Sequence, residues 1–287
     1  TGKIDLAIKK LHEKGYLFEQ DGALWFRSTD FGDDKDRVVK KQDGDLTYAA
    51  ADIAYIEDKI DRGHDELIYI LGHDHHSYAT RLQGLLQALG HQLPLDVILY
   101  QLVKIKEDGE QMRMSKRSGR IVSLQDIIDT VGKDVARFFY LNRKADAQLE
   151  FDITLAQTHT DENPVYYIQY AYVRTGSILE KAIEHENLQN ISAKDLHNLS
   201  SADDYLVKKI ASLKELLEAI SRNHQTHLLA YYTYELAQLF NRYYARNRVI
   251  DLEHPQISRT RLAIVAIVRE TLSLCLDLLG LSKPRRM

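Results

Sequence analysis

Hydrophobic positions in the first half of the chain predict helices alternating with short strands. The spacing predicts helices over residues 4–14 and 53–60 and short strands over residues 24–27 and 38–40. Residues 67–71 are a continuous run of apolar and β-forming side chains that ends at Gly72, and a helical pattern follows. This order predicts a buried parallel strand, a turn and a helix. Ligands of such sheets bind beyond the carboxyl ends of the strands, so the turn after Gly72 is a candidate nucleotide site.

The next segment predicts a hairpin and two short helices. An apolar run over residues 97–103 predicts another strand, and Asp108-Gly109 is typical of a tight hairpin turn. The hairpin would present the loop that follows it. Apolar spacing then predicts short helices over residues 124–131 and 135–141.

After about residue 156 the pattern becomes helical. Asn163-Pro164 is typical of a helix start, with Asn as the N-cap and Pro in the first turn. Apolar side chains then recur at steps of three and four over residues 206–220, 229–243 and 265–279. These stretches predict amphipathic helices long enough for a bundle core, joined by a polar connection over residues 187–204. We therefore expect an α/β domain over residues 1–156 and an all-α domain over residues 157–287.

Composition is that of a soluble globular protein, with 44% hydrophobic and 28% charged residues among 287. No apolar run approaches the roughly 20 residues that span a bilayer, so no membrane partner is expected. Net charge is −4, and the predicted helical domain carries +1 against −5 for the remainder, an asymmetry too small to establish a nucleic-acid surface. The single cysteine, Cys275, excludes an intramolecular disulfide and favours a reducing cytoplasm. Its apolar helical surroundings predict a packed core thiol.

A basic loop follows the predicted hairpin and contains Arg113, Met114, Ser115 and Lys116. Taken alone, it could be a solvated run of charge. Its Met-Ser-Lys core resembles the second signature of class I aminoacyl-tRNA synthetases, in which a lysine on a mobile loop neutralises ATP phosphate charge as pyrophosphate leaves. Lys116 is then the main catalytic candidate, with Arg113, Met114 and Ser115 beside it.

Further segments resemble one family, the arginyl-tRNA synthetases of bacteria. They are residues 24–37 (LWFRSTDFGDDKDR), 72–76 (GHDHH), 135–139 (VARFF) and 161–171 (DENPVYYIQYA), and the resemblance runs in order from about residue 8 to residue 287. It implies the C-terminal part of a Rossmann-type class I catalytic domain followed by an all-α helical-bundle anticodon-binding domain. No His-x-Gly-His, the first class I signature, occurs in the chain, which starts at Thr1-Gly2. We therefore expect the C-terminal part of a longer synthetase, catalytically incomplete by itself.

The resemblance also implies two groups of ligand-binding residues in the α/β part. From spacing alone, the N-cap interpretation of Asp52 is favoured over the ligand interpretation; in the family its segment reads the arginine side chain, and the resemblance therefore implies a ligand. The implied arginine-binding residues are Tyr48, Asp52, Tyr55 and His75, and the implied ATP-binding residues are Gly72, Asp74, His75, His76 and Lys116. The histidines invite a metal interpretation, but adjacent histidines on a turn point in different directions and no further ligand completes a zinc shell. No tightly bound metal is expected.

In the helical part, aromatic and cationic side chains are candidates for tRNA binding. Tyrosines in a bundle are often core residues and helix arginines are often solvated, but unpaired RNA bases are read by stacking and hydrogen bonds. The candidates are Tyr166, Tyr170, Arg242, Arg246 and Arg248, with Arg286 and Met287 at the C-terminus.

The expected function is that of an arginine-tRNA ligase. Its substrates would be L-arginine, ATP with Mg²⁺, and tRNA-Arg, and it would act as a monomer in the cytoplasm. One alternative is a non-catalytic tRNA anticodon-binding module; another is a paralogue that uses the fold for a different ligand. Pyrophosphate exchange by the chain separates the first two.

Overall fold

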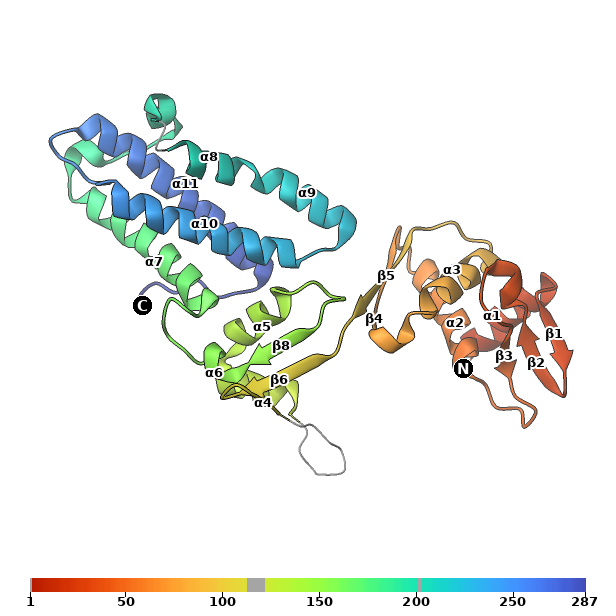
Figure 1. The fold of residues 1–287 in the computed structure, drawn as a ribbon. Coiled ribbons are helices and arrows are strands. Elements are labelled where there is room, and N and C mark those ends of the chain that lie inside the picture. The colour runs from red at the N-terminus through yellow and green to blue at the C-terminus, as the bar shows by residue number, and fades with distance from the viewer. Residues whose placement is uncertain (1, 113–121, 201–202) are drawn as a thin grey trace. The chain divides into compact units, whose positions relative to one another are not determined.

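The computed structural model of the chain describes residues 2–112, 122–200 and 203–287 (Figure 1). The chain forms two compact units, Thr1–Leu102 and Val103–Met287, which are described separately. The domain boundary predicted near residue 156 lies within the second unit and stays a prediction. No helix in the described ranges is both long and apolar enough to cross a membrane.

The first unit joins two small sheets to three helices. In chain order its elements are α1 (Gly2–Glu13), β1 (Leu17–Gln20), β2 (Ala23–Phe26), the 3-10 turn η1 (Ser28–Phe31), β3 (Arg37–Lys40), α2 (Tyr48–Asp61), β4 (Leu67–Gly72), the 3-10 turn η2 (His73–His75), α3 (Tyr78–Leu89) and β5 (Leu95–Tyr100). Strands β1, β2 and β3 form an antiparallel sheet in that order, and β4 pairs with β5 in parallel. One core holds the unit together, and its fully buried side chains include Leu11, Phe26, Ile53, Ile56, Leu82 and Leu85.

The pairing of β4 confirms the predicted parallel strand, but its predicted burial is wrong. Leu67 is 2% exposed and lies in the core, whereas Ile68 is 42% exposed and Ile70 is 67% exposed. Side chains of a strand alternate between two faces. Within the described part of the chain, only the face that carries Leu67, Tyr69 and Leu71 packs against the core.

The second unit begins with a small three-stranded sheet. Its elements are β6 (Val103–Glu107), β7 (Glu110–Gln111), α4 (Leu124–Val131), α5 (Lys133–Leu141), β8 (Leu149–Asp152) and α6 (Ile153–Ala156). The predicted hairpin is confirmed: β6 and β7 are antiparallel, and Asp108 and Gly109 both have positive φ, 51° and 81°, as a type I′ turn requires. The strand expected over residues 97–103 is wrong as one element, because β5 ends at Tyr100 and β6 starts at Val103.

The rest of the second unit is a helical bundle, as predicted. Its elements are α7 (Pro164–Ile183), the 3-10 turns η4 (Glu186–Leu188) and η5 (Ala193–Asn198), α8 (Asp204–Ala211), α9 (Leu213–Asn223), α10 (His227–Arg246) and α11 (Pro255–Leu279). Helices α7, α10 and α11 pack against one another (Figure 1). The apolar run over residues 206–220 forms two helices rather than one, because the helix is interrupted at Ser212. Cys275 is fully buried in this core, as expected, and burial raises the pKa of its thiol to about 11.

Asn163 starts α7 as predicted. It is 2% exposed, and its side-chain oxygen accepts a hydrogen bond from the Val165 backbone N–H at 3.0 Å. Its amide nitrogen donates to the carbonyls of Ala156 and Thr158, at 3.0 and 2.9 Å. One side chain thus satisfies the first turn of α7 and fixes the chain that leads into it. The order of the elements confirms the predicted fold class, an α/β part followed by an all-α bundle.

Candidate functional site

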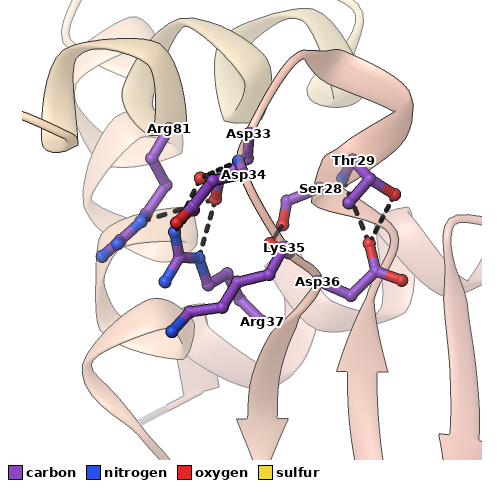
Figure 2. A network of polar contacts seen from close by, with 8 residues as sticks. All are labelled: Ser28, Thr29, Asp33, Asp34, Lys35, Asp36, Arg37 and Arg81. Carbon is purple, nitrogen blue, oxygen red and sulfur yellow. Dashed lines mark hydrogen bonds and ion pairs between the residues drawn. The ribbon is translucent and has the colours of Figure 1, made fainter.

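The loop between η1 and β3 is held by its own side chains (Figure 2). The Arg37 guanidinium donates to both oxygens of Asp33, from Nε at 2.8 Å and from Nη2 at 2.6 Å, and it also pairs with Asp34. The Asp33 side chain is only 3% exposed. Burial raises the pKa of this carboxyl, but the hydrogen bonds from Arg37 and Asp34 outweigh burial and hold the pKa well below its usual range. Asp33 is therefore a fixed buried anion.

This loop packs directly on α3. A Cβ added to Gly84 would lie 2.9 Å from Cβ of Phe31, so the close approach of α3 to η1 requires glycine at this position. The contact brings Arg81, one turn into α3, toward Asp33, with 3.7 Å between Arg81 Nε and Asp33 Oδ2 (Figure 2). The Arg81 guanidinium also lies 4.3 Å from the centre of the Tyr78 ring.

Asp52 lies in the second turn of α2, and Tyr78 and Arg81 of α3 influence its pKa. The N-cap of α2 is Thr47, so the alternative that Asp52 is an N-cap is wrong. The Asp52 Oδ2 atom is buried and has no hydrogen-bond partner among the described residues. Burial raises the pKa of Asp52, while the Tyr78 hydroxyl and the charge of Arg81 oppose the rise. This carboxylate thus has one buried oxygen without a hydrogen-bond partner among the described residues.

Two tyrosines and one lysine contact one another in the same unit as Asp52, and the charge of Asp52 acts on one of the tyrosines. The Tyr69 hydroxyl, from the inward face of β4, is buried and unpaired within the described ranges. Burial and the charge of Asp52 raise the pKa of Tyr69 to about 12. The Tyr55 and Tyr69 rings meet edge to face at 6.5 Å, and Lys59 Nζ lies 3.6 Å from the centre of the Tyr69 ring. Asp52 Oδ2 and the Tyr69 hydroxyl, each buried and without a hydrogen-bond partner among the described residues, make this a candidate polar site.

The predicted arginine-binding residues differ in how far they are exposed. Tyr48 starts α2 and is 86% exposed, one turn before Asp52, and Tyr55 is 52% exposed. His75 reaches Tyr78, with 5.2 Å between the ring centres.

Four of the predicted ATP-binding residues, Gly72, Asp74, His75 and His76, lie together at the carboxyl end of β4. Asp74 and His76 are exposed, and Gly72 has a φ of −65° with room for a Cβ. The fold itself therefore does not require glycine at position 72, and its role toward ATP stays a prediction. Arg113, Met114, Ser115 and Lys116 lie outside the described residues.

Sequence reasoning missed Tyr69, Tyr78, Arg81 and Asp33. Tyr69 could have been found, because alternation along β4 places it on the same face as the buried Leu67. The others could not, because the contacts between η1 and α3 join residues about 50 positions apart.

A basic cavity of about 650 Å³ lies in the helical bundle, between α7 and the chain around the end of α10. Its polar lining residues are Arg174, Ser177, Lys181, Tyr244, Arg246, Asn247 and Arg248. Among the described residues that line it, four are cationic and none is acidic. The Arg174 guanidinium lies 4.4 Å from the centre of the Tyr170 ring and 5.2 Å from that of Tyr244, and it donates to the Tyr170 hydroxyl at 2.9 Å.

The structure gathers only some of the predicted tRNA-binding residues at this cavity. Arg246 and Arg248 line it, and Tyr170 contacts its wall through Arg174, which sequence reasoning missed. Tyr166 instead lines a separate cavity of about 310 Å³ and meets the His159 ring at 5.9 Å. The side chains of Arg242, Arg286 and Met287 are exposed.

Two parts of the chain each match a known protein family. Residues 2–151 match the catalytic domain of the tRNA synthetases class I (R), and residues 168–287 match the DALR anticodon binding domain. The chain is 45% identical over 288 aligned positions to an arginine–tRNA ligase of Citrifermentans bemidjiense and 43% identical over 289 to that of Bacillus subtilis. Each alignment covers all of this chain and 52% of the relative, so the chain spans about half the length of the curated relatives it matches.

Solved structures are similar over the whole chain. A putative arginyl-tRNA synthetase from Campylobacter jejuni aligns with all of this chain and 62% of its own, at a TM-score of 0.90 and 31% identity. The arginyl-tRNA synthetase of Thermus thermophilus aligns at a TM-score of 0.83 and 21% identity, covering all of this chain and 58% of its own, a similarity of fold alone. The catalytic-domain match covers more than half of the residues of this chain. The chain therefore belongs to the class I tRNA synthetases of the arginine type.

Proposed function

We propose that the chain is the part of an arginine-tRNA ligase that binds the arginine side chain and the tRNA anticodon. In the complete reaction, the arginine carboxylate would attack the α-phosphate of ATP and release pyrophosphate, and the arginyl group would then pass to the terminal ribose of tRNA-Arg. Such chemistry needs no covalent bond to the enzyme. Positioning and neutralisation of phosphate charge would supply most of the rate.

The observation that carries this proposal is the unpaired oxygen of Asp52. A carboxylate with a buried oxygen that has no partner among the described residues favours a cationic ligand, because an uncompensated buried charge is costly. A guanidinium supplies the charge in a planar fork that donates to carboxylates and stacks on aromatic rings. Tyr48 and Tyr55, on the helix that carries Asp52, can supply such rings.

ATP is proposed to bind at the end of β4, through Gly72, Asp74, His75 and His76, and Lys116 is proposed as the lysine that neutralises its phosphate charge. The position fits the general rule that ligands lie beyond the carboxyl ends of parallel strands. Mg²⁺ usually binds through substrate phosphates with few protein ligands, so it would arrive with ATP.

The tRNA anticodon is proposed to bind at the basic cavity of the bundle. Guanidinium groups contact phosphates, and the partly exposed side chains of Tyr170 and Tyr244 can contact unpaired bases. A monomer acting in the cytoplasm, with Cys275 as a free buried thiol, completes the proposal.

The alternative, a non-catalytic anticodon-binding module, differs in one measurable respect. Arginine-dependent exchange of pyrophosphate into ATP by this chain would show that it activates arginine by itself. We expect no exchange at a rate typical of an intact enzyme, because the chain lacks His-x-Gly-His and loss of even one transition-state donor can cost about 10²–10³-fold. Calorimetric titration with L-arginine tests the binding half. Absence of arginine binding together with retained RNA binding would favour the alternative.

A further inference from the structure

The chain that follows α11 is held on the second unit from its first residue onward. The Arg137 guanidinium of α5 donates from Nε to the carbonyl of Leu279, the last residue of α11. Gly280 then turns the chain with a φ of 68°, and a Cβ at this position would lie 2.5 Å from Arg137 Nε. Both the backbone conformation and the closeness of Arg137 therefore require glycine here. Leu281, which is 5% exposed, packs into the core of the bundle.

Ser282 is held by two side chains from different helices. The Asp134 carboxylate of α5 accepts hydrogen bonds at Oδ2 from the Ser282 backbone N–H, at 3.1 Å, and from the Ser282 hydroxyl. The same oxygen accepts from the Gln169 amide of α7 at 2.8 Å, and that amide also donates to the Ser282 carbonyl at 3.1 Å. We call Asp134, Gln169 and Ser282 the C-terminal clasp. Hydrogen bonds to ionised groups are roughly twice as strong as neutral ones, so the carboxylate is the main support of the clasp.

Beyond the C-terminal clasp, the chain presents two cations to solvent. Lys283 is paired with Asp277 of α11 at 2.7 Å, and Pro284 restricts the backbone that follows. Arg285 and Arg286 are both exposed. Their guanidinium groups are therefore accessible to an anionic partner.

The C-terminal clasp lies near the basic cavity along α7, where the C-terminus of the chain is also found (Figure 1). Gln169 of the clasp precedes Tyr170, and the Tyr170 ring contacts Arg174, which lines the cavity. Five residues of helix separate Gln169 from Arg174, a rise of about 7.5 Å. The two exposed arginines follow Ser282 by three and four residues, and an extended chain of that length spans at most about 14 Å. An RNA backbone bound at the cavity is thus within reach of both guanidinium groups.

We propose that Asp134 is a positioning residue for RNA binding. Through the C-terminal clasp it holds Arg285 and Arg286 where they contact phosphates of an RNA bound at the basic cavity. Asp134 lies in the part of the chain that matches the catalytic domain, whereas Gln169 and Ser282 lie in the part that matches the anticodon binding domain. A residue of the catalytic-domain match thus supports the RNA surface. This inference rests on the proposed function, because it assumes that RNA binds at the cavity.

Asp134→Ala should weaken RNA binding even though it removes a negative charge. Loss of the carboxylate leaves Ser282 held only by Gln169, so the arginines beyond it lose their fixed position. Affinity for an arginine-tRNA anticodon stem-loop should fall roughly tenfold, and the salt slope should fall by about one for each arginine that loses its phosphate. A purely electrostatic effect would have the opposite sign, because removal of an anion favours a polyanionic ligand.

The experiment compares the 287-residue chain with Asp134→Ala and with Asp129→Ala as the matched control. Asp129 is an exposed carboxylate of α4 that accepts a hydrogen bond from Gln125 of the same helix. Its loss removes the same charge and leaves the C-terminal clasp intact. Fluorescence titration at two salt concentrations measures affinity and salt slope, and heteronuclear NOE values of the last backbone amides measure the fast motion of the tail. Thermal unfolding checks that each variant is folded.

A further variant separates positioning of the tail from a general effect on the fold. The double variant Arg285→Ala, Arg286→Ala has no guanidinium groups beyond the clasp. Adding Asp134→Ala to it should therefore not weaken RNA binding further. Residues that act through one another show such non-additivity, whereas independent effects add.

Weaker RNA binding and lower NOE values in Asp134→Ala, with Asp129→Ala unchanged and no further loss in the tail variant, support the inference. Unchanged RNA affinity in Asp134→Ala overturns it, as does a loss that adds in full to that of the tail variant, which would show a merely structural role. If the unmodified chain does not bind the stem-loop, the proposed RNA partner fails instead, and the NOE comparison alone then decides whether Asp134 orders the tail.

Discussion

At the residue scale, the candidate site depends on how buried carboxylates are compensated. Both oxygens of Asp33 accept hydrogen bonds from Arg37, whereas Asp52 Oδ2 has no hydrogen-bond partner in the part of the chain that the structure describes, although both lie within one small unit. A paired buried charge stabilises a local arrangement, and an unpaired one favours a ligand of opposite charge. The two aspartates are therefore expected to respond differently to the same substitution.

Asp52→Asn should weaken L-arginine binding by about a hundredfold, or about 3 kcal/mol, because the guanidinium would be desolvated without a negative partner. ATP affinity should stay nearly unchanged, since the predicted ATP residues lie on the turn after β4 rather than on α2. Calorimetric titration with each ligand measures both. Asp61→Asn, an exposed change on the same helix, is the control. A fall in ATP affinity instead would assign Asp52 to the nucleotide.

Asp33→Asn should destabilise the first unit by about 3 kcal/mol at neutral pH, because it leaves the Arg37 guanidinium without its buried partner. The pKa of Asp33 is lowered in the folded state, so the ion pair stabilises the fold fully above the ordinary value near pH 4. This contribution is lost as the pH falls through the folded-state pKa.

The difference in unfolding free energy between the unmodified chain and Asp33→Asn should therefore shrink at acid pH. Urea unfolding at neutral pH and at about pH 3 measures it. Asp34→Asn, at a side chain that is 68% exposed, should cost less than about 1 kcal/mol. A difference that stays constant with pH would contradict the assigned pKa.

At the element scale, the buried faces of helices were easier to predict from the sequence than the positions and contacts of helix ends. The apolar stripes of α10 and α11 could be read from spacing alone, since periodicity marks the buried face of a helix. The break between α8 and α9 could not, because the apolar spacing continues across Ser212 without a Gly or Pro. The start of α7 was predictable, but the additional contacts of its cap were not.

Asn163→Ala should destabilise the second unit by about 2 kcal/mol, at the upper end for the loss of an N-cap. The amide is buried, and its removal leaves the Val165 N–H and the carbonyls of Ala156 and Thr158 without this partner. Urea unfolding monitored by circular dichroism measures the change. Asn163→Asp keeps the acceptor and loses both donors, so an intermediate loss is expected. Equal stability of all three proteins would show that the cap is not important.

At the scale of the whole molecule, the two parts are expected to serve two ligands. The first unit has the site proposed for arginine, and the bundle has the basic cavity. A net charge of −4 does not favour RNA binding over the whole surface, so any RNA-binding surface must be a local basic region. This separation means that RNA binding should not require the chemistry of the first unit.

The chain should bind an arginine-tRNA anticodon stem-loop weakly, with an affinity that falls as salt rises, because phosphate contacts release counterions. Arg246→Ala and Arg248→Ala should each reduce the salt slope by about one, while Arg222→Ala, outside the cavity lining, should not. Fluorescence titration at two salt concentrations measures the slopes. A stem-loop with a scrambled anticodon should bind less tightly, since unpaired bases are read individually. Equal affinity for both loops would reduce the cavity to a nonspecific RNA surface.

The sequence by itself determined the class of each part and the candidate residues that lie close together along the chain. Periods of two and 3.6 residues record which side chains face a core, and turn residues such as Asp108-Gly109 act through their own backbone. Asp52 and the turn after Gly72 were found in this way together with the family resemblance. These are local properties, and a linear chain contains them directly.

Only the tertiary structure decided how the candidate site is supported. It brought Arg81 of α3 to Asp33 of the loop, and it left Asp52 Oδ2 of α2 without a described partner. It also set Tyr166 apart from Tyr170 and added Arg174 to the basic cavity. Such contacts depend on which helix packs on which loop, and pairing between distant residues leaves no periodic trace along the chain.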